Sequence, residues 1–147
     1  MTLPKQFQKE NTENIFIYHY VEEMIASYGK YIKEVFDESE ITRSELPFLI
    51  RIRFNEKTTQ KELVELFKVS EGYTAKLLRK FEDLGYITRM EDPSNRRKKI
   101  VELTDNGIEK TDELIELIDN WETKVTSEMS DDEVKQLKSL LFKVVSS

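Results

Sequence analysis

Apolar residues recur at steps of three and four in two long stretches, one towards each end of the chain, and this spacing predicts amphipathic helices. The first stretch covers residues 14–36, and Asp37-Glu38-Ser39-Glu40 ends it. The second starts at Thr104-Asp105-Asn106-Gly107 and continues through Val125. A last helix is expected after Ser130-Asp131-Asp132-Glu133, where a hydroxyl residue precedes a Glu by three positions, as in a capping box.

The middle of the chain has shorter helical periods that begin at cap residues. Thr42-Arg43-Ser44-Glu45 has the capping-box pattern and predicts a helix that continues to about Phe54. Thr59-Gln60-Lys61-Glu62 repeats the pattern and predicts a short helix over residues 59–67.

The helix that follows has one apolar stripe and one polar face. Ser70 is expected to cap it, residues 71–84 to form it and Gly85 to end it. The expected buried stripe consists of Thr74, Leu77, Leu78, Phe81 and Leu84. The residues expected to face outward are Lys76, Arg79, Lys80 and Asp83.

Beyond Gly85 the period changes from that of a helix to that of a strand. Residues 86–91 and 98–103 are rich in β-branched side chains, and they flank the turn-forming run 92–97. This pattern predicts a β-hairpin with a basic tip. The expected fold class is therefore all-α with a small two-stranded β-wing, that is, a winged helix-turn-helix plus N- and C-terminal dimerisation helices.

Composition favours an open, helical molecule that pairs with a second copy. Hydrophobic residues make up 38% of the 147 residues and charged residues 35%. This apolar share is low, so we expect the long helices to bury their stripes against a partner chain. The expected organisation is one intertwined unit, with an N-terminal dimerisation helix over residues 1–41, a winged helix-turn-helix DNA-binding region over 42–103 and C-terminal dimerisation helices over 104–147.

The chain has no Cys, which removes disulfides and thiolate metal sites. Its polar start does not resemble a signal peptide, and no apolar run reaches the roughly 18 residues that a membrane span requires. We therefore expect a cytoplasmic protein with no membrane partner.

Charge is distributed unevenly around a net value of −6. Residues 43–103 carry 14 Lys and Arg against 10 Asp and Glu, whereas the rest of the chain carries 9 against 19. A slim helix suits the major groove and a thin Arg-bearing hairpin suits the minor groove, so the basic middle indicates binding to double-stranded DNA. The candidate DNA-binding residues are Ser70, Tyr73, Lys76, Arg79, Lys80, Arg96 and Arg97.

The residues over 55–107 also resemble the MarR family of transcriptional regulators. The stretches that carry the resemblance are Thr59-Gln60-Lys61-Glu62-Leu63, Ser70, Leu77, Phe81-Glu82-Asp83-Leu84-Gly85-Tyr86-Ile87, Arg89, Asp92-Pro93-Ser94-Asn95-Arg96-Arg97 and Leu103-Thr104-Asp105-Asn106-Gly107. The closest match is the wing pattern, D-P-x-D-R-R followed by a strand and L-T-x-x-G. Helix order and length extend the resemblance to nearly the whole chain.

The resemblance implies a homodimer whose two winged units bind a palindromic operator, with Lys76 and Arg79 at the major groove and Arg97 in the minor groove. It also implies a repressor that is released by a small aromatic or anionic effector bound between the dimerisation and DNA-binding regions. One residue departs from the pattern, because the family usually has Asp at the position of Asn95. Asn lacks the charge that would hold a wing Arg, so we expect a less rigid wing.

Other interpretations of the same residues stay open. Winged helices also serve as protein–protein interaction modules without DNA binding, and salt-sensitive binding to duplex fragments separates the two functions. Residues 96–99 also fit a solvated charge run. The first predicted helix carries an aromatic stripe that consists of Tyr18, Tyr20, Tyr28, Tyr31 and Phe36. These residues fit the core and the dimer interface, and they also fit the wall of a ligand pocket.

Catalysis and metal binding find no support in the sequence. The chain has no nucleophile elbow, no Gly-rich phosphate loop and no His paired with a nucleophile. His19 is the single histidine and has no cluster around it, which argues against a metal site. We therefore expect no enzyme activity, no catalytic residues and no cofactor.

Overall fold

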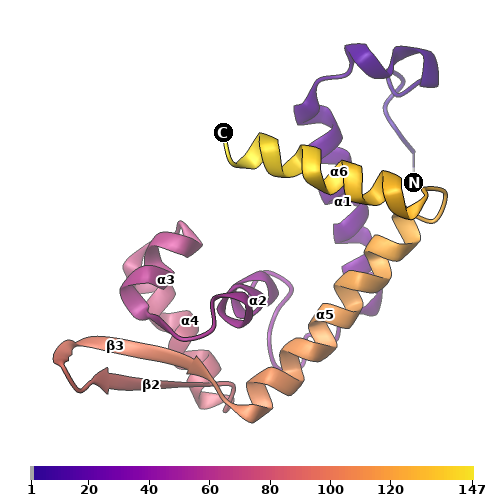
Figure 1. The fold of residues 1–147 in the computed structure, drawn as a ribbon. Coiled ribbons are helices and arrows are strands. Elements are labelled where there is room, and N and C mark those ends of the chain that lie inside the picture. Colours follow the sequence, from indigo (N-terminus) through magenta and orange to yellow (C-terminus); the bar gives the residue numbers. More distant parts are fainter. Residues whose placement is uncertain (1) are drawn as a thin grey trace.

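The computed structural model describes residues 2–147 and consists of a group of long helices and a compact winged unit (Figure 1). Helices α1, α5 and α6 form the first part, and both chain termini lie at its far end. The elements are the 3₁₀ helix Lys9–Asn14, α1 (Ile17–Val35), α2 (Leu46–Asn55), β1 (Thr58–Thr59), α3 (Gln60–Phe67), α4 (Glu71–Asp83), β2 (Ile87–Asp92), β3 (Asn95–Leu103), α5 (Asp105–Val125) and α6 (Asp131–Val145). This architecture confirms the predicted fold class. No helix of the described part is both long and apolar enough to cross a bilayer.

Side-chain caps set most of the helix boundaries. The Glu62 backbone N–H donates to Thr59 Oγ1 at 3.2 Å and the Thr59 N–H donates back to Glu62 Oε2 at 3.2 Å, which completes the expected capping box of α3. The same reciprocal pair forms between Ser130 and Glu133 at the start of α6. Gly85 has φ +82°, a backbone region that strongly favours glycine, so it ends α4 as expected.

Two helix starts differ from the prediction. The box between Thr42 and Glu45 forms, but regular helix begins only at Leu46. Pro47 explains the difference, because it lacks the N–H that would bond to the Arg43 carbonyl and its ring crowds that carbonyl. The first long helix begins at Ile17 rather than at residue 14, because a 3₁₀ turn precedes it.

The sheet has three strands in the order β1-β3-β2, not the two expected. Thr58 and Thr59 pair with β3 opposite Val101 and Ile100, which adds a short edge strand before α3. β3 also starts earlier than predicted, so Arg96 and Arg97 lie in the strand and only Pro93 and Ser94 form the loop. Asp92 closes this loop by accepting hydrogen bonds from the Ser94 N–H and hydroxyl.

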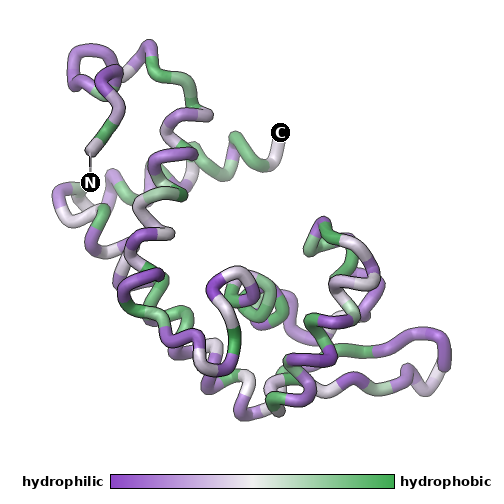
Figure 2. The backbone as a smooth tube through the Cα atoms, turned by 180° about the vertical axis from the view of Figure 1, so that it is seen from behind, coloured by the Kyte–Doolittle hydropathy of each residue, from purple (hydrophilic) through white to green (hydrophobic). Residues whose placement is uncertain are grey.

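The hydrophobic core lies in the winged unit and at its contact with α5. Its fully buried members include Leu49, Leu63, Leu78 and Phe81 from α2, α3 and α4, and Leu114 from α5. Helix α6, by contrast, has no buried residue. Hydrophobic and hydrophilic residues nevertheless alternate along this helix, as the colours near the C-terminus in Figure 2 show.

Candidate nucleic-acid interface

Helix α4 presents a polar face opposite its buried stripe. Thr74, Leu77, Leu78 and Phe81 are buried, as predicted. Lys76 and Arg79 are exposed and three residues apart, so they project from nearly the same side of the helix. Neither side chain forms an ion pair with any other residue of the described chain.

The N-terminal end of α4 is held by Ser70 and by an aromatic contact with α2. Ser70 Oγ accepts a hydrogen bond from the Tyr73 N–H at 3.1 Å, so its hydroxyl serves as the cap that the sequence predicts. The Tyr73 ring lies 6.0 Å from the Phe48 ring at an interplanar angle of 70°, an edge-to-face arrangement. Both candidate residues therefore lie at the exposed start of the helix, next to α2.

Lys80 is partly exposed, one helical turn from Lys76, but unlike Lys76 and Arg79 it forms an ion pair within the chain. Its Nζ lies 2.7 Å from Glu45 Oε1, and its side chain is partly buried against α2. Burial alone would raise the pKa of Glu45, but the hydrogen bonds from Lys80 and Thr42 and the Lys80 charge outweigh burial and hold that pKa below its ordinary value. A direct contact of Lys80 with DNA stays a prediction.

The wing carries four consecutive cations along the exposed half of β3. Lys99 pairs with Glu91 but Asn95 pairs with Asp92, so Arg96, Arg97 and Lys98 lie at a register irregularity of the hairpin, where side chains need not alternate regularly. The Arg97 N–H donates to Asn95 Oδ1 at 3.1 Å. Asn95 thus holds the backbone next to the loop.

A hollow of about 960 Å³ separates the wing from the N-terminal ends of α3 and α4. Its lining combines wing cations with residues of the two helices: Thr59, Gln60, Lys61, Glu62, Val64, Glu65, Glu71, Arg97, Lys98 and Lys99. The tertiary structure therefore brings Arg97 to the same side of the molecule as the start of α4.

Arg89, which carries part of the family resemblance but received no role from the sequence, joins the wing to both helices of the helix-turn-helix. Its guanidinium donates to Glu82 of α4 at 3.1 Å and to Gln60 of α3 at 3.4 Å, and the side chain is only 17% exposed. The Arg89 hydrogen bond lowers the pKa of Glu82. A local signal for this role is lacking, because the partners are 7 and 29 residues away in sequence.

Several carboxylates near the basic residues are already engaged within the chain. Hydrogen bonds from Thr58 and Thr59 lower the pKa of Glu62. Hydrogen bonds from Ser94 do the same for Asp92 in the wing loop. These carboxylates stay ionised, but each is bonded to a protein donor. Lys76, Arg79 and the four cations of β3 form no ion pair within the described residues, so they are the charges available to an anionic ligand.

Within residues 2–147, no group of three or more His, Cys, Asp and Glu side chains is placed to hold a metal ion. The arrangement therefore offers exposed cations on a helix and a hairpin, a chemistry suited to polyanion binding.

Comparison with known proteins agrees with this geometry. The MarR family model matches residues 41–99. The HTH-type transcriptional regulator BilQ of Clostridium symbiosum is 32% identical over 99 residues, which are 67% of this chain and 69% of that protein. An uncharacterized HTH-type transcriptional regulator, YybA of Bacillus subtilis, is 31% identical over 72 residues, 49% of this chain and 48% of its own length.

Solved structures extend the similarity to the long helices. A crystal structure of MarR has a TM-score of 0.76 and 26% identity and covers 90% of each chain. A MarR mutant from E. coli, solved in complex with operator DNA, has a TM-score of 0.69 and 24% identity, with 90% of this chain and 95% of that chain covered. Because the chain matches BilQ over two thirds of its length and the MarR family model matches residues 41–99, the chain belongs to the MarR family of transcriptional regulators.

Proposed function

We propose that the protein is a sequence-specific DNA-binding repressor that acts as a homodimer, with α4 in the major groove and the wing in the minor groove. The observation that carries the proposal is the set of unpaired cations on the outer face of α4 and along β3, next to carboxylates that are bonded within the chain. Direct contacts are assigned to Lys76, Arg79, Arg96 and Arg97, and supporting contacts to Ser70 and Tyr73. The operator complex of the E. coli MarR mutant supports this assignment by its shared fold.

The long helices support a dimer, because they expose apolar side chains that one chain alone does not cover. On α6 these are Leu137, Leu140, Leu141, Phe142, Val144 and Val145, and on and before α1 they are Phe16, Ile17, Tyr18, Val21, Met24, Ile25 and Val35. An exposed apolar area of this kind marks a protein interface. Two-fold symmetry would then set the recognition helices about 34–36 Å apart, which matches a palindrome of half-sites one helical turn apart.

Binding to duplex DNA at several salt concentrations tests the function. The probe is a duplex recovered by selection from a random-sequence library, and a scrambled duplex is the competitor. We expect a specific complex whose affinity falls steeply with salt, because Lys and Arg displace counterions from phosphates. A folded dimer that selects no sequence and binds no duplex would instead support the protein–protein interaction module.

Arg97→Ala is expected to weaken operator binding by about tenfold to a hundredfold, the loss associated with one Arg contact at a base edge or groove. The dimer and its thermal unfolding should stay unchanged, because the side chain is exposed. Arg43→Ala is the matched control, since it removes an exposed Arg that pairs with Glu38 on the loop before α2. Equal operator affinity of Arg97→Ala and wild type in an anisotropy titration would contradict the wing assignment.

We also propose an effector site between α1 and α5. A cavity of about 380 Å³ lies there, and Phe36 and Lys110 supply an aromatic ring and a cation on its walls. Asp37, Glu113 and Glu116 also line the cavity, and Lys110 lies 3.8 Å from the Glu113 carboxylate, so the lining suits a small uncharged aromatic compound better than an acid, and binding there would release DNA. A ligand at 100 times its dissociation constant stabilises the fold by about 2.7 kcal/mol, so a thermal-shift panel of small aromatic compounds, acids included, detects it. If no compound of the panel raised the unfolding temperature, the proposed effector site would be contradicted, and the protein would be a regulator without an effector of this class.

A further inference from the structure

Two α4 side chains contact α2 while staying partly exposed, those of Tyr73 and Lys80. Tyr73 and Lys80 are seven residues apart, which is two helical turns, so they lie along one flank of α4. On the other side, Phe48 lies in the first turn of α2 and Glu45 is its N-cap residue. Phe48 contacts Tyr73 and Glu45 contacts Lys80, so α2 holds α4 at two points along its length.

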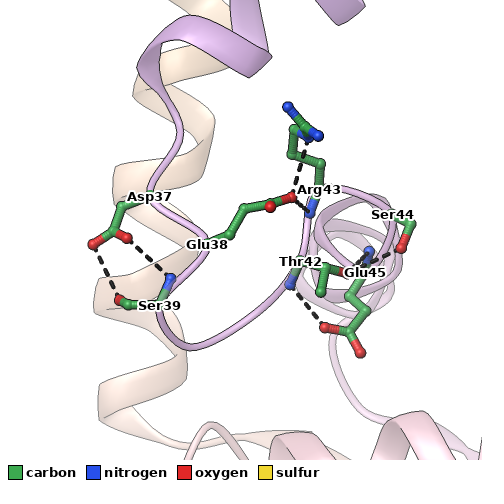
Figure 3. A network of polar contacts seen from close by, with 7 residues as sticks. All are labelled: Asp37, Glu38, Ser39, Thr42, Arg43, Ser44 and Glu45. Carbon is green, nitrogen blue, oxygen red and sulfur yellow. Dashed lines mark hydrogen bonds and ion pairs between the residues drawn. The ribbon is translucent and has the colours of Figure 1, made fainter.

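Hydrogen bonds within its own loop hold the Glu45 side chain in place, independently of Lys80. Its Oε1 accepts the Thr42 N–H at 2.8 Å, while the Glu45 N–H donates to Thr42 Oγ1 at 3.3 Å, and Figure 3 shows these bonds in the loop before α2. The same Oε1 accepts from Lys80 Nζ at 2.7 Å. The Glu45 side chain is 15% exposed and that of Lys80 38%. A carboxylate this buried loses its only cation if Lys80 turns to a phosphate.

The loop that carries Glu45 is also attached to the end of α4. The Tyr86 hydroxyl, three residues beyond α4, donates to Glu40. Ile41 beside it is 1% exposed and belongs to the hydrophobic core. The loop between α1 and α2 is therefore a fixed support against which Lys80 can hold the helix.

We propose that Lys80 is a positioning residue: the buried stripe of α4 sets its place in the core, the ion pair with Glu45 holds the final rotation of the helix about its axis, and the Lys80 ammonium group does not contact DNA phosphate. Rotation matters because successive residues of a helix are 100° apart, so a small turn moves Arg79 away from its base edge. The inference rests on the proposed DNA-binding function and changes the role assigned to one of its candidate residues.

The matched pair Lys80→Met and Lys76→Met tests the role, with the full-length dimer and the selected duplex at several salt concentrations. Both changes remove one ammonium group from α4. We expect Lys76→Met to weaken binding to selected and scrambled duplexes alike and to reduce the salt slope by about 1, as the loss of a phosphate contact does. Lys80→Met is expected to weaken only the selected duplex, by about tenfold, with the salt slope unchanged.

Glu45→Gln provides the second arm, because the amide oxygen still accepts the Thr42 N–H while the charge that holds Lys80 is gone. We expect Glu45→Gln to lower affinity for the selected duplex about as much as Lys80→Met, and the double variant to be no weaker than either single one, since the two residues act as one unit. Thermal unfolding of each variant confirms that the dimer is folded.

The outcomes separate this inference from the proposed function. A reduced salt slope in Lys80→Met, together with tighter binding by Glu45→Gln, would show that Lys80 is a phosphate contact and would overturn the inference alone. A wild-type dimer that binds no duplex would overturn both the proposed function and the role of Lys80 in it.

Discussion

Gly107→Ala is expected to lower the free energy of unfolding by about 3 kcal/mol, the upper end of the cost of forcing an extra methyl group into a packed site. A Cβ at this position would lie 2.0 Å from the Tyr86 carbonyl oxygen and 2.9 Å from Leu103 Cδ2. The first contact is with backbone, which cannot rotate away. That carbonyl also accepts the Thr104 N–H at 3.0 Å, so moving it would break the bond that joins the end of the sheet to the start of α5.

The loss is measurable by chemical denaturation at one fixed protein concentration, because the stability of a dimer depends on concentration. Gly72→Ala in α4 is the control, since its added Cβ meets nothing within 4 Å. Alanine is the better helix former, so this control should be at least as stable as wild type. A Gly107→Ala protein within about 0.5 kcal/mol of wild type, the range of ordinary surface changes, would show that the junction adapts.

Leu140→Asp is expected to raise the dissociation constant of the proposed dimer more than a hundredfold, because an unpaired carboxylate would be buried in an apolar interface. Leu140 is 52% exposed in the single chain, so the substitution should leave the fold of each subunit intact. Loss of the dimer should also lose most operator affinity, since each subunit supplies one half-site contact.

Sedimentation over a range of protein concentrations measures this effect. Ser139→Asp is the matched control, because Ser139 lies on the opposite, polar side of α6 and the same charge is added one residue away. The control should remain a dimer. If Leu140→Asp were as dimeric as the control at nanomolar concentration, the apolar face of α6 would not be the dimer interface.

Local chemistry made most of the fold predictable. The capping boxes at Thr59 and Ser130, the cap at Ser70 and the terminator Gly85 act within one turn of chain, so the residues that form each bond are near one another in sequence. The buried stripe of α4 follows from the helical period for the same reason. Basic residues of the wing were likewise visible, although their place in strand β3 rather than in the turn was not.

The features that the sequence did not predict depend on contacts between distant segments. Strand β1 exists only because Thr58 and Thr59 meet β3 more than forty residues later, and two residues have no period to detect. Lys80 has the same spacing from the apolar stripe as many exposed helix residues, and only the approach of α2 gives it Glu45 as a partner. Arg89 is joined to Gln60 and Glu82 in the same way.

The sequence by itself thus determined the order and type of the six α-helices of the described chain and of the wing hairpin, the cations on α4 and the wing, and the resemblance to a regulator family, because these follow from short-range periodicity, caps and motifs. Only the tertiary structure decided which cations are free and which are held. An ion pair depends on where two side chains of different elements come together, and that position is set by packing of the core around Leu49, Leu78 and Phe81. The requirement for glycine at position 107 has the same origin, since it arises from the close approach of α5 to the Tyr86 carbonyl.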